Sequence, residues 1–189
     1  MAPSSRQSFT PQPATVGLGP AFAAVYHQEL AYVWHSLRRL GVRSEDLSDV
    51  THDVFMTLWR RFGDLDRERP SRPWIFGMAM RVAMAYRRRA FRLRERLFGE
   101  PLELIDPAPT PEAQLADAER QQLVREALAT LDLPRRAVLI MHDFDGTSGQ
   151  EIALALDLPL KTMYSRLAAA RARFVKAYRR AERKRGRSS

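Results

Sequence analysis

The chain has 189 residues, with 31 Lys and Arg against 22 Asp and Glu, a formal net charge of +9 and a sequence pI near 10.7. The basic excess favours a polyanionic partner, nucleic acid before an acidic membrane surface, and the 45% of hydrophobic residues excludes a wholly disordered chain. The absence of Cys excludes disulfides and thiolate metal sites and is typical of a reducing compartment.

Neither a membrane span nor a signal peptide is indicated. No apolar run approaches the roughly 20 residues that cross a bilayer, and the N-terminus lacks the apolar core of a signal sequence. We therefore expect a cytoplasmic protein without membrane insertion. Residues 1–18 are rich in Pro, Ser, Thr and Gly, and we expect them to form a disordered tail.

The first helix is expected from Ala21 to Leu40, where apolar residues recur at a helical spacing, and Gly41 is expected to end it. His27 and His35 lie within this stretch. A lone His on a helix is more often a surface or packing residue than a ligand, and no second group of ligands stands nearby. We expect no metal site.

The second helix, expected over residues 44–61, carries an acidic ridge. Ser44 is expected to cap it, and Asp46, Asp49 and Asp53 recur three and four residues apart on a face separate from the apolar stripe. Acids near a helix N-terminus favour the macrodipole and solubility, which accounts for Asp46 but poorly for Asp53. The alternative is a docking face for a basic partner, and the spacing alone leaves both interpretations open.

A charged loop with two prolines, residues 63–73, precedes a helix opened by Trp74. This helix runs into an arginine-rich stretch, residues 87–96, in which arginines mix with aromatic residues. That mixture is typical of phosphate contact and base stacking on single-stranded nucleic acid, although a solvated charged face with aromatic core residues has the same composition.

The chain is expected to divide at residues 99–111, where four prolines exclude a helix or central strand. This linker would separate a first helical domain, residues 19–98, from a second, residues 112–185. The second domain is expected to begin with helices over 112–130 and 135–144.

The stretch from Gly146 to Leu167 has the pattern of a helix-turn-helix. Ser148 and Glu151 have capping-box spacing, and Asp157 stands where the chain must turn. The second helix keeps an apolar stripe from Met163 onward. An ordinary helical hairpin with a solvated basic face is the alternative. The residues left off the stripe at its start are Lys161, Thr162, Tyr164, Ser165 and Arg166.

Together, three segments resemble a bacterial RNA polymerase sigma factor of the sigma-70 family, extracytoplasmic-function group. Residues 44–60 resemble the polymerase-binding helix of region two, residues 72–89 the helix that melts and reads the minus-ten element, and residues 133–173 region four, which reads the minus-thirty-five element. The resemblance implies an all-α chain: a region-two helical bundle and a region-four helix-turn-helix joined by a flexible Pro-rich linker.

The resemblance also implies roles. The chain would be a specificity subunit without catalytic residues or cofactors, directing polymerase core to promoters and melting them. Its partners would be promoter DNA, the clamp helices of the largest polymerase subunit, the flap, and an anti-sigma factor; bound to polymerase it would be nucleoid-associated. The implied core-docking residues are Asp46, Asp49 and Asp53. The implied minus-ten residues are Asp64, Arg72, Trp74, Arg81, Arg87 and Arg88. The implied minus-thirty-five residues are Lys161, Thr162, Tyr164, Ser165, Arg166 and Arg173.

Departures from the family pattern fall on the expected DNA faces: Met80-Arg81 stands for the usual Arg-Asn, and Lys161–Tyr164 replaces the usual start of the recognition helix. They leave promoter choice open.

Three other functions compete with that of a sigma factor. The chain could be a helix-turn-helix regulator without sigma activity, a sigma mimic that sequesters an anti-sigma factor, or a recombinase using Tyr164 or Ser165. A mimic needs no basic DNA faces, and no acid–base or metal cluster surrounds the two hydroxyls.

Overall fold

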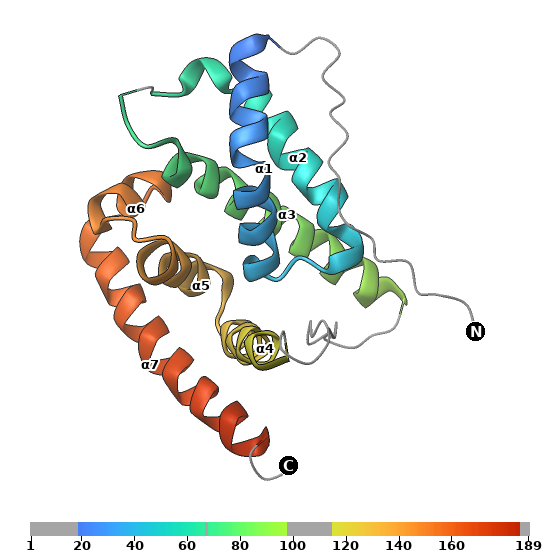
Figure 1. Ribbon diagram of the computed structural model, residues 1–189, viewed down its shortest axis with the longest axis vertical. Coiled ribbons are helices and arrows are strands. Elements are labelled where there is room, and N and C mark those ends of the chain that lie inside the picture. The colour runs from blue at the N-terminus through green and yellow to red at the C-terminus, as the bar shows by residue number, and fades with distance from the viewer. Residues whose placement is uncertain (1–18, 67, 98–114, 186–189) are drawn as a thin grey trace.

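The computed structural model describes residues 19–66, 68–97 and 115–185, and every regular element in these ranges is helical. The expected tail, residues 1–18, and the expected linker, residues 99–111, lie outside them. The elements, shown in Figure 1, are α1 (Pro20–Leu40), η1 (Ser44–Asp46), α2 (Leu47–Arg60), η2 (Phe62–Asp64), α3 (Ser71–Leu97), α4 (Leu115–Ala129), α5 (Leu133–Leu139), η3 (Ile140–Phe144), α6 (Gly149–Ala155) and α7 (Leu160–Arg185). The expected all-α fold is therefore confirmed for the described residues.

Helices α1, α2 and α3 pack on one another as the first half of the molecule. Their apolar stripes meet in a core, with Val33 and Leu37 of α1 and Val54 of α2 fully buried. Burial of such stripes is the main source of helix stability in a bundle. Gly41 ends α1 as expected, since its φ of 89° is a left-handed conformation that glycine adopts without strain.

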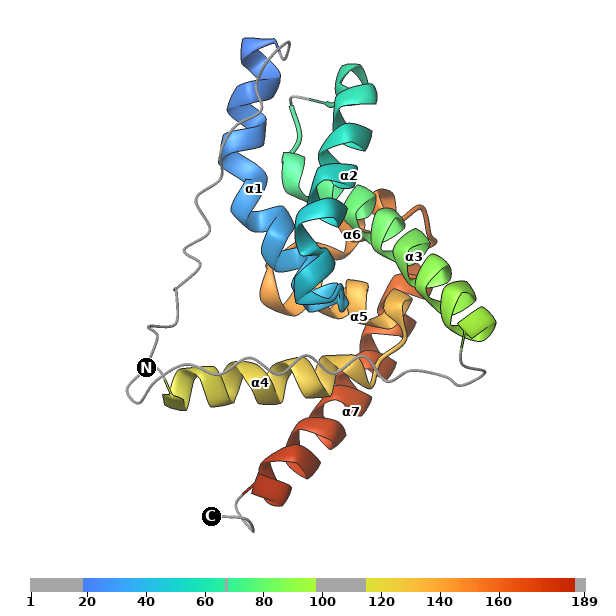
Figure 2. The ribbon, with the colours of Figure 1, turned by 90° about the vertical axis from the view of Figure 1, so that its right-hand side faces the viewer.

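Helices α4 to α7 form the second half, with α7 packed against α4, α5 and α6. Figure 2 shows α4 lying across the long helix α7. The expected capping box is present at the start of α6: the Glu151 amide donates to Ser148 Oγ at 3.3 Å, and the Ser148 amide donates to Glu151 Oε2 at 3.0 Å. Asp157 has a φ of 52° between α6 and α7, which confirms the expected turn.

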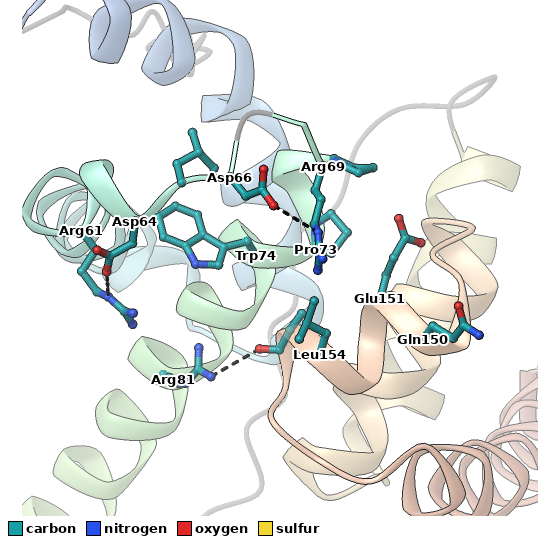
Figure 3. Close-up of a pocket in the computed structure, with 13 residues that line it drawn as sticks. Arg61, Asp64, Asp66, Arg69, Pro73, Trp74, Arg81, Gln150, Glu151 and Leu154 are labelled. Atoms are coloured by element: carbon teal, nitrogen blue, oxygen red, sulfur yellow. Dashed lines mark hydrogen bonds and ion pairs between the residues drawn. The ribbon is translucent and has the colours of Figure 1, made fainter.

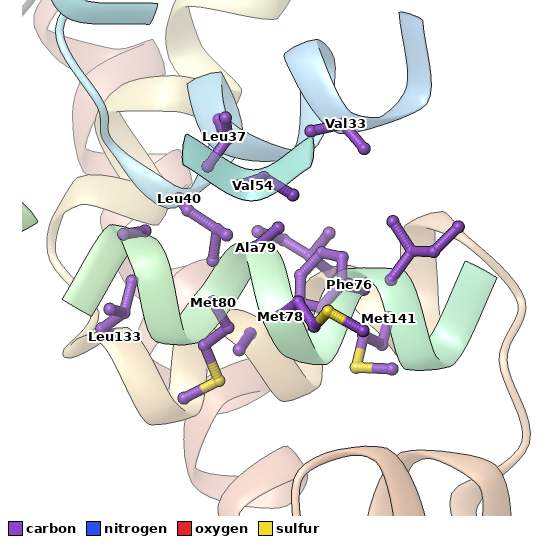
Figure 4. Packing of buried hydrophobic residues seen from close by; sticks show 14 of the residues in the cluster. Val33, Leu37, Leu40, Val54, Phe76, Met78, Ala79, Met80, Leu133 and Met141 are labelled. Atoms are coloured by element: carbon purple, nitrogen blue, oxygen red, sulfur yellow. The ribbon is translucent and has the colours of Figure 1, made fainter. Parts of the chain in front are cut away.

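The two halves meet along a seam. Figure 4 shows α3 between them, with Leu37 and Val54 on one side and Leu133 and Met141 on the other. A Cβ atom added to Gly77 of α3 would lie 2.5 Å from the Ala155 carbonyl oxygen of α6, so the close approach requires glycine at this position. The buried residues of both halves therefore belong to one continuous cluster.

Polar contacts also cross the seam. Tyr32 Oη of α1 donates a 2.9 Å hydrogen bond to Asp145, and Arg39 lies 3.3 Å from the same carboxylate. Arg136 of α5 donates from Nη1 to the Leu40 carbonyl at 3.0 Å, at the C-terminal end of α1. A cation is favoured at that end of the helix dipole.

Three local expectations need correction. Ser44 does not cap the second helix, because a turn of 3₁₀-helix precedes α2 and Asp46 takes the capping position without a side-chain bond. Helix α3 begins at Ser71, three residues before Trp74. The helix expected over 135–144 is instead α5, which ends at Leu139, followed by a π-helical turn, η3. Within the described ranges, no helix is both long and apolar enough to cross a membrane.

Candidate protein and nucleic-acid interfaces

The acidic ridge lies on α2 and η1. Asp49 and Asp53 are exposed, and Asp49 has no ion pair among the described residues. Asp53 lies 3.5 Å from Arg89, while Asp46 accepts a 2.7 Å hydrogen bond from Tyr86 Oη. Burial and this bond raise the pKa of Tyr86 to about 12. The structure thus leaves Asp49 and Asp53 exposed, with Asp53 weakly paired to Arg89 of α3, and it ties Asp46 to the same helix through Tyr86.

Apolar side chains accompany these acids, and the sequence reading missed them. Met56 and Trp59 are 38% and 39% exposed on α2, although both are large and hydrophobic. The Trp59 ring meets the Phe22 ring edge-on at a centroid distance of 5.0 Å. Positions 49, 53 and 56 are one helical turn apart, so the spacing itself was the available signal. Acids beside exposed apolar groups are suited to a protein interface.

Three of the expected minus-ten residues, Asp64, Trp74 and Arg81, line one pocket of about 600 Å³ (Figure 3). Segments 61–66 and 69–70, the first part of α3, and α6 form its walls. Arg81 Nη2 donates to the Ala155 carbonyl at 3.3 Å, and Arg61 Nε donates to Asp64 at 2.9 Å. The pocket combines an indole face with guanidinium groups, which together suit stacking and hydrogen bonding to a base.

The other three expected minus-ten residues lie elsewhere. Arg72 is absent from the pocket lining and pairs with Glu29 of α1 at 2.9 Å. Arg88 is exposed, whereas Arg87 is half-buried and its Nη1 atom is buried. Burial, followed by the nearby charge of Arg87, lowers the pKa of Arg136 to about 10. Neighbouring helix residues point about 100° apart, so Arg87 and Arg88 serve different faces.

The expected minus-thirty-five residues gather at the start of α7. Lys161, Tyr164 and Ser165 are exposed, Thr162 and Arg166 are partly exposed, and Met163 beneath them is fully buried. Arg173 is exposed further along the helix. The Tyr164 hydroxyl lies over the first turn of α6, since a Cβ atom on Gly149 would come within 2.7 Å of it. A basic helix that is exposed on one side and packed against the protein on the other can enter a major groove.

A charge cluster fixes α7 to the π-helical turn η3. Arg171 Nε donates to Asp143 Oδ2 at 2.9 Å, and His142 Nδ1 lies 2.9 Å from Asp143 Oδ1. The Arg171 hydrogen bond holds the pKa of Asp143 below its usual value. The cluster therefore stabilises the packing of α7 on η3. No group of three His, Cys, Asp or Glu side chains within the described part of the chain could hold a metal ion.

Comparison with known families defines the class of protein. Residues 25–92 match the family model described as sigma-70 region 2, and residues 121–174 match the one described as sigma-70 region 4. RNA polymerase sigma factor NccH of Alcaligenes xylosoxydans xylosoxydans is 31% identical over 159 residues, covering 82% of this chain and 85% of NccH. RNA polymerase sigma factor CnrH of Cupriavidus metallidurans is 30% identical over 182 residues, covering 92% and 94%.

The relatives narrow the class. The sigma factor SigL of Mycobacterium tuberculosis, named as an extracytoplasmic-function factor, is 29% identical over 149 residues, covering 76% of this chain and 81% of SigL. The chain belongs to the sigma-70 family of RNA polymerase sigma factors, in its extracytoplasmic-function group. It is a transcription initiation factor that directs RNA polymerase to promoters, and the competing functions are not favoured.

Solved structures share the fold. The sigma factor RpoE from Bartonella quintana, in complex with the anti-sigma factor NepR, aligns with a TM-score of 0.72 at 19% identity, covering 85% of this chain and 98% of RpoE. CnrH in complex with the cytosolic domain of CnrY aligns with a TM-score of 0.58 at 26% identity, covering 85% and 89%.

Proposed function

We propose that the α2 face docks on core polymerase while α3 and α7 read the two promoter elements, with domain boundaries at residues 19–98 and 112–185 around a linker at 99–111. The observation that carries this division of labour is the segregation of charge. The exposed acids Asp49 and Asp53 lie together with Met56 on one face of α2, in a chain of net charge +9. Complementary charge governs both the specificity and the rate of encounter.

At the minus-ten element, the part of the pocket that belongs to the first half, beside Trp74, takes one base flipped from the non-template strand once α6 has moved away. Flipping a base costs a few kcal/mol, which stacking and hydrogen bonds in a pocket offset. Trp74 supplies the stacking surface, and Arg81 and Asp64 supply donors and acceptors. Arg88, exposed on the same helix, contacts the phosphate backbone. Arg87 acts at the other side of α3, near Arg136.

At the minus-thirty-five element, the start of α7 enters the major groove. Lys161, Tyr164 and Ser165 carry base-edge contacts, with Thr162 and Arg166 at the edge of the same surface. Arg173 holds a phosphate and sets register without selecting sequence. The basic end of α7 adds phosphate affinity that does not depend on sequence.

Reading both elements requires the seam to open. The names of the elements place them roughly 25 base pairs apart, or about 85 Å at about 3.4 Å per base pair. In the structure Arg81 contacts Ala155, which precedes Lys161 by six residues (161 − 155), a separation that an extended chain spans in at most about 22 Å. The closed arrangement therefore holds the two readers too close together to occupy both elements at once.

The closed arrangement suits capture by an inhibitor. RpoE is described in complex with an anti-sigma factor and CnrH in complex with the cytosolic domain of CnrY, and each alignment covers 85% of this chain. An anti-sigma partner for this chain would hold the seam shut and cover the α2 face. Because it would act on polymerase, we expect the chain in the cytoplasm, and at the nucleoid when it is bound to polymerase.

The docking assignment is tested by the affinity of purified core polymerase for the fluorescently labelled chain. Asp49→Arg plus Asp53→Arg is expected to weaken binding about 100-fold or more, because like charges placed across an interface cost several kcal/mol. The matched control, Glu119→Arg plus Glu182→Arg, makes the same change of charge on two exposed acids of the second half. Unchanged affinity for the α2 double variant would remove the docking assignment. Run-off transcription on a promoter then tests the reading function.

A further inference from the structure

Glu29 is a buried carboxylate in the middle of α1. The residue is 2% exposed, and its Oε2 atom accepts from Arg72 Nε at 2.9 Å. Arg72 is its only ion-pair partner among the described residues. Removing a carboxylate from water is costly unless a well-placed partner compensates. Glu29 interrupts the apolar side of α1 next to Leu30, where a hydrophobic residue would pack at no such cost.

Arg72 is held from two sides. Its Nε faces Glu29, and the centre of its guanidinium lies 5.0 Å from the centroid of the Tyr32 ring, as in a cation–π contact. Yet 58% of its side chain is exposed. An arginine carries five N–H donors, and only Nε–H is used among the described residues. The two terminal nitrogens are therefore left free, with the plane and direction of the guanidinium already set.

We propose that Glu29 is a positioning residue for promoter opening: with the Tyr32 ring, it aims Arg72 at a backbone phosphate of the opened minus-ten strand. This proposal rests on the minus-ten role of α3 stated above. A guanidinium fork with fixed orientation matches a phosphate. Arg72 opens α3, two residues before Trp74, but lies outside the base pocket. It therefore holds the strand beside the base that enters the pocket.

The arrangement does not depend on the closed seam. Glu29 and Tyr32 belong to α1 and Arg72 to α3, all in the first half of the molecule. Among the hydrogen bonds and ion pairs of Glu29, Tyr32 and Arg72, opening the seam breaks only the 2.9 Å bond from Tyr32 Oη to Asp145. The ring of Tyr32 and the carboxylate of Glu29 stay with Arg72, so the fork keeps its orientation when promoter is read.

Removing the Glu29 carboxylate has opposite effects on DNA binding if Glu29 positions Arg72 and if it acts only through its charge. Removing the carboxylate makes the chain more positive by one charge, which by itself strengthens binding to DNA. Loss of orientation has the opposite effect, since the fork must then be ordered during binding. Glu29→Met has a similar length and suits a buried site, but cannot accept a hydrogen bond. Glu29→Gln keeps an acceptor oxygen and loses only the charge, so it serves as the conservative variant.

The experiment measures promoter opening by holoenzyme at saturating core polymerase, with 2-aminopurine placed in the minus-ten element. We expect Glu29→Met and Arg72→Gln each to slow opening about 10-fold, as for loss of a charged hydrogen bond. Glu29→Gln should fall between them and the wild type, and the double variant should be no slower than Arg72→Gln alone. Glu45→Gln, which removes an exposed acid from η1, is the charge-matched control and should open at the wild-type rate or faster.

Two further measurements on Arg72 variants make the result decisive. Arg72→Gln should reduce the slope of log affinity against log salt by about one, and Arg72→Lys should keep the slope while opening slowly. Opening by Glu29→Met at or above the wild-type rate, or additive effects in the double variant, would overturn the proposal and leave Glu29 a structural residue. Failure of the wild-type holoenzyme to open any promoter would instead contradict the proposed function.

Discussion

Helices α3 and α7 are of similar length, 27 and 26 residues, and both are basic, but the molecule uses them differently. Helix α3 runs between the two halves, with Ile75, Phe76 and Ala79 fully buried. Helix α7 buries only Met163, Leu167 and Ala170 among its described side chains. The polar side chains of a helix that is buried on several sides need partners within the protein. A helix that is buried along a single stripe can present its polar side chains to a ligand.

The polar side chains near the starts of the two helices follow this difference. Arg81 of α3 donates to the Ala155 carbonyl, and Arg72 pairs with Glu29. At the start of α7, by contrast, Lys161 and Tyr164 are exposed. The closed molecule therefore presents the proposed minus-thirty-five surface, while part of the proposed minus-ten surface is engaged in internal contacts. Opening the seam would change the exposure of polar groups in the first half far more than in the second. Substitutions at the seam should therefore affect the two surfaces differently.

The largest effect is expected at Arg136, where the seam depends on a buried cation. Its two terminal nitrogens donate to the Leu40 and Leu131 carbonyls, each at 3.0 Å. Arg136→Met would leave both carbonyls without these donors and should lower the free energy of unfolding by about 2 kcal/mol. For a chain of this size that is a fall in Tm of roughly 4–8 °C, measured by calorimetry.

The neighbouring Arg135 supplies the control, because it is exposed and pairs only with Asp132 at the surface. Arg135→Met should lower the free energy of unfolding by about 1 kcal/mol or less. Equal losses for the two variants would mean that the buried contact with α1 contributes nothing special to the seam.

A smaller effect on stability, confined to the seam, is expected from a substitution at Gly77. A Cβ atom there would meet the Ala155 carbonyl at 2.5 Å, so Gly77→Ala should destabilise the seam by about 1–2 kcal/mol. Within α3 the same change favours helix by up to about 1 kcal/mol. The two effects have opposite signs, so the halves should separate without loss of helix.

Separation is measured by energy transfer between dyes on Cys introduced at Gln28 and Glu182, both exposed positions in a chain that has no Cys of its own. Gly77→Ala should lower the transfer efficiency. Gly63→Ala, with no atom within 4 Å of the added Cβ, should not. Unchanged transfer for Gly77→Ala would show that the seam tolerates the methyl group.

Sequence reasoning succeeded where the determining contacts are local. The capping box joins Ser148 to Glu151, three residues apart, and the turn at Asp157 depends on that residue's own tolerance of the left-handed region. Apolar spacing likewise located α1 and α2, because a helix buries one stripe wherever its partner comes from. Ser44 was misread because a 3₁₀ turn competes with α-helix at the same residues.

The contacts that sequence reasoning missed join residues far apart in the chain. Glu29 and Arg72 are separated by 43 residues, Leu40 and Arg136 by 96, and Tyr32 and Asp145 by 113. No spacing rule connects such pairs, since their meeting depends on how whole helices pack. The α3 arginines were expected as DNA readers from the family resemblance, and neither that resemblance nor the local composition distinguishes a free guanidinium from one that is already engaged.

The smallest effect is expected within the second half, at the cluster that supports α7. The pKa of Asp143 is held below its usual value by Arg171, so the carboxylate binds a proton less readily in the folded state than in the unfolded state. Its stabilisation is therefore complete above the unfolded pKa, near 4, and is lost as the pH falls through the lower folded pKa. For a pair this exposed the contribution is about 0.5 kcal/mol.

Thermal unfolding at two pH values measures this contribution. Asp143→Asn should lower the Tm slightly at pH 7, by roughly 1–2 °C, and the difference from wild type should shrink at pH 3. Glu182→Gln, an exposed acid near the end of α7, controls for the change in net charge. Dye separation across the seam should be the same in Asp143→Asn and wild type, because Asp143 and Arg171 both belong to the second half. A change in that separation would mean that the support of α7 and the closure on α3 are coupled, and that the two long helices do not respond independently.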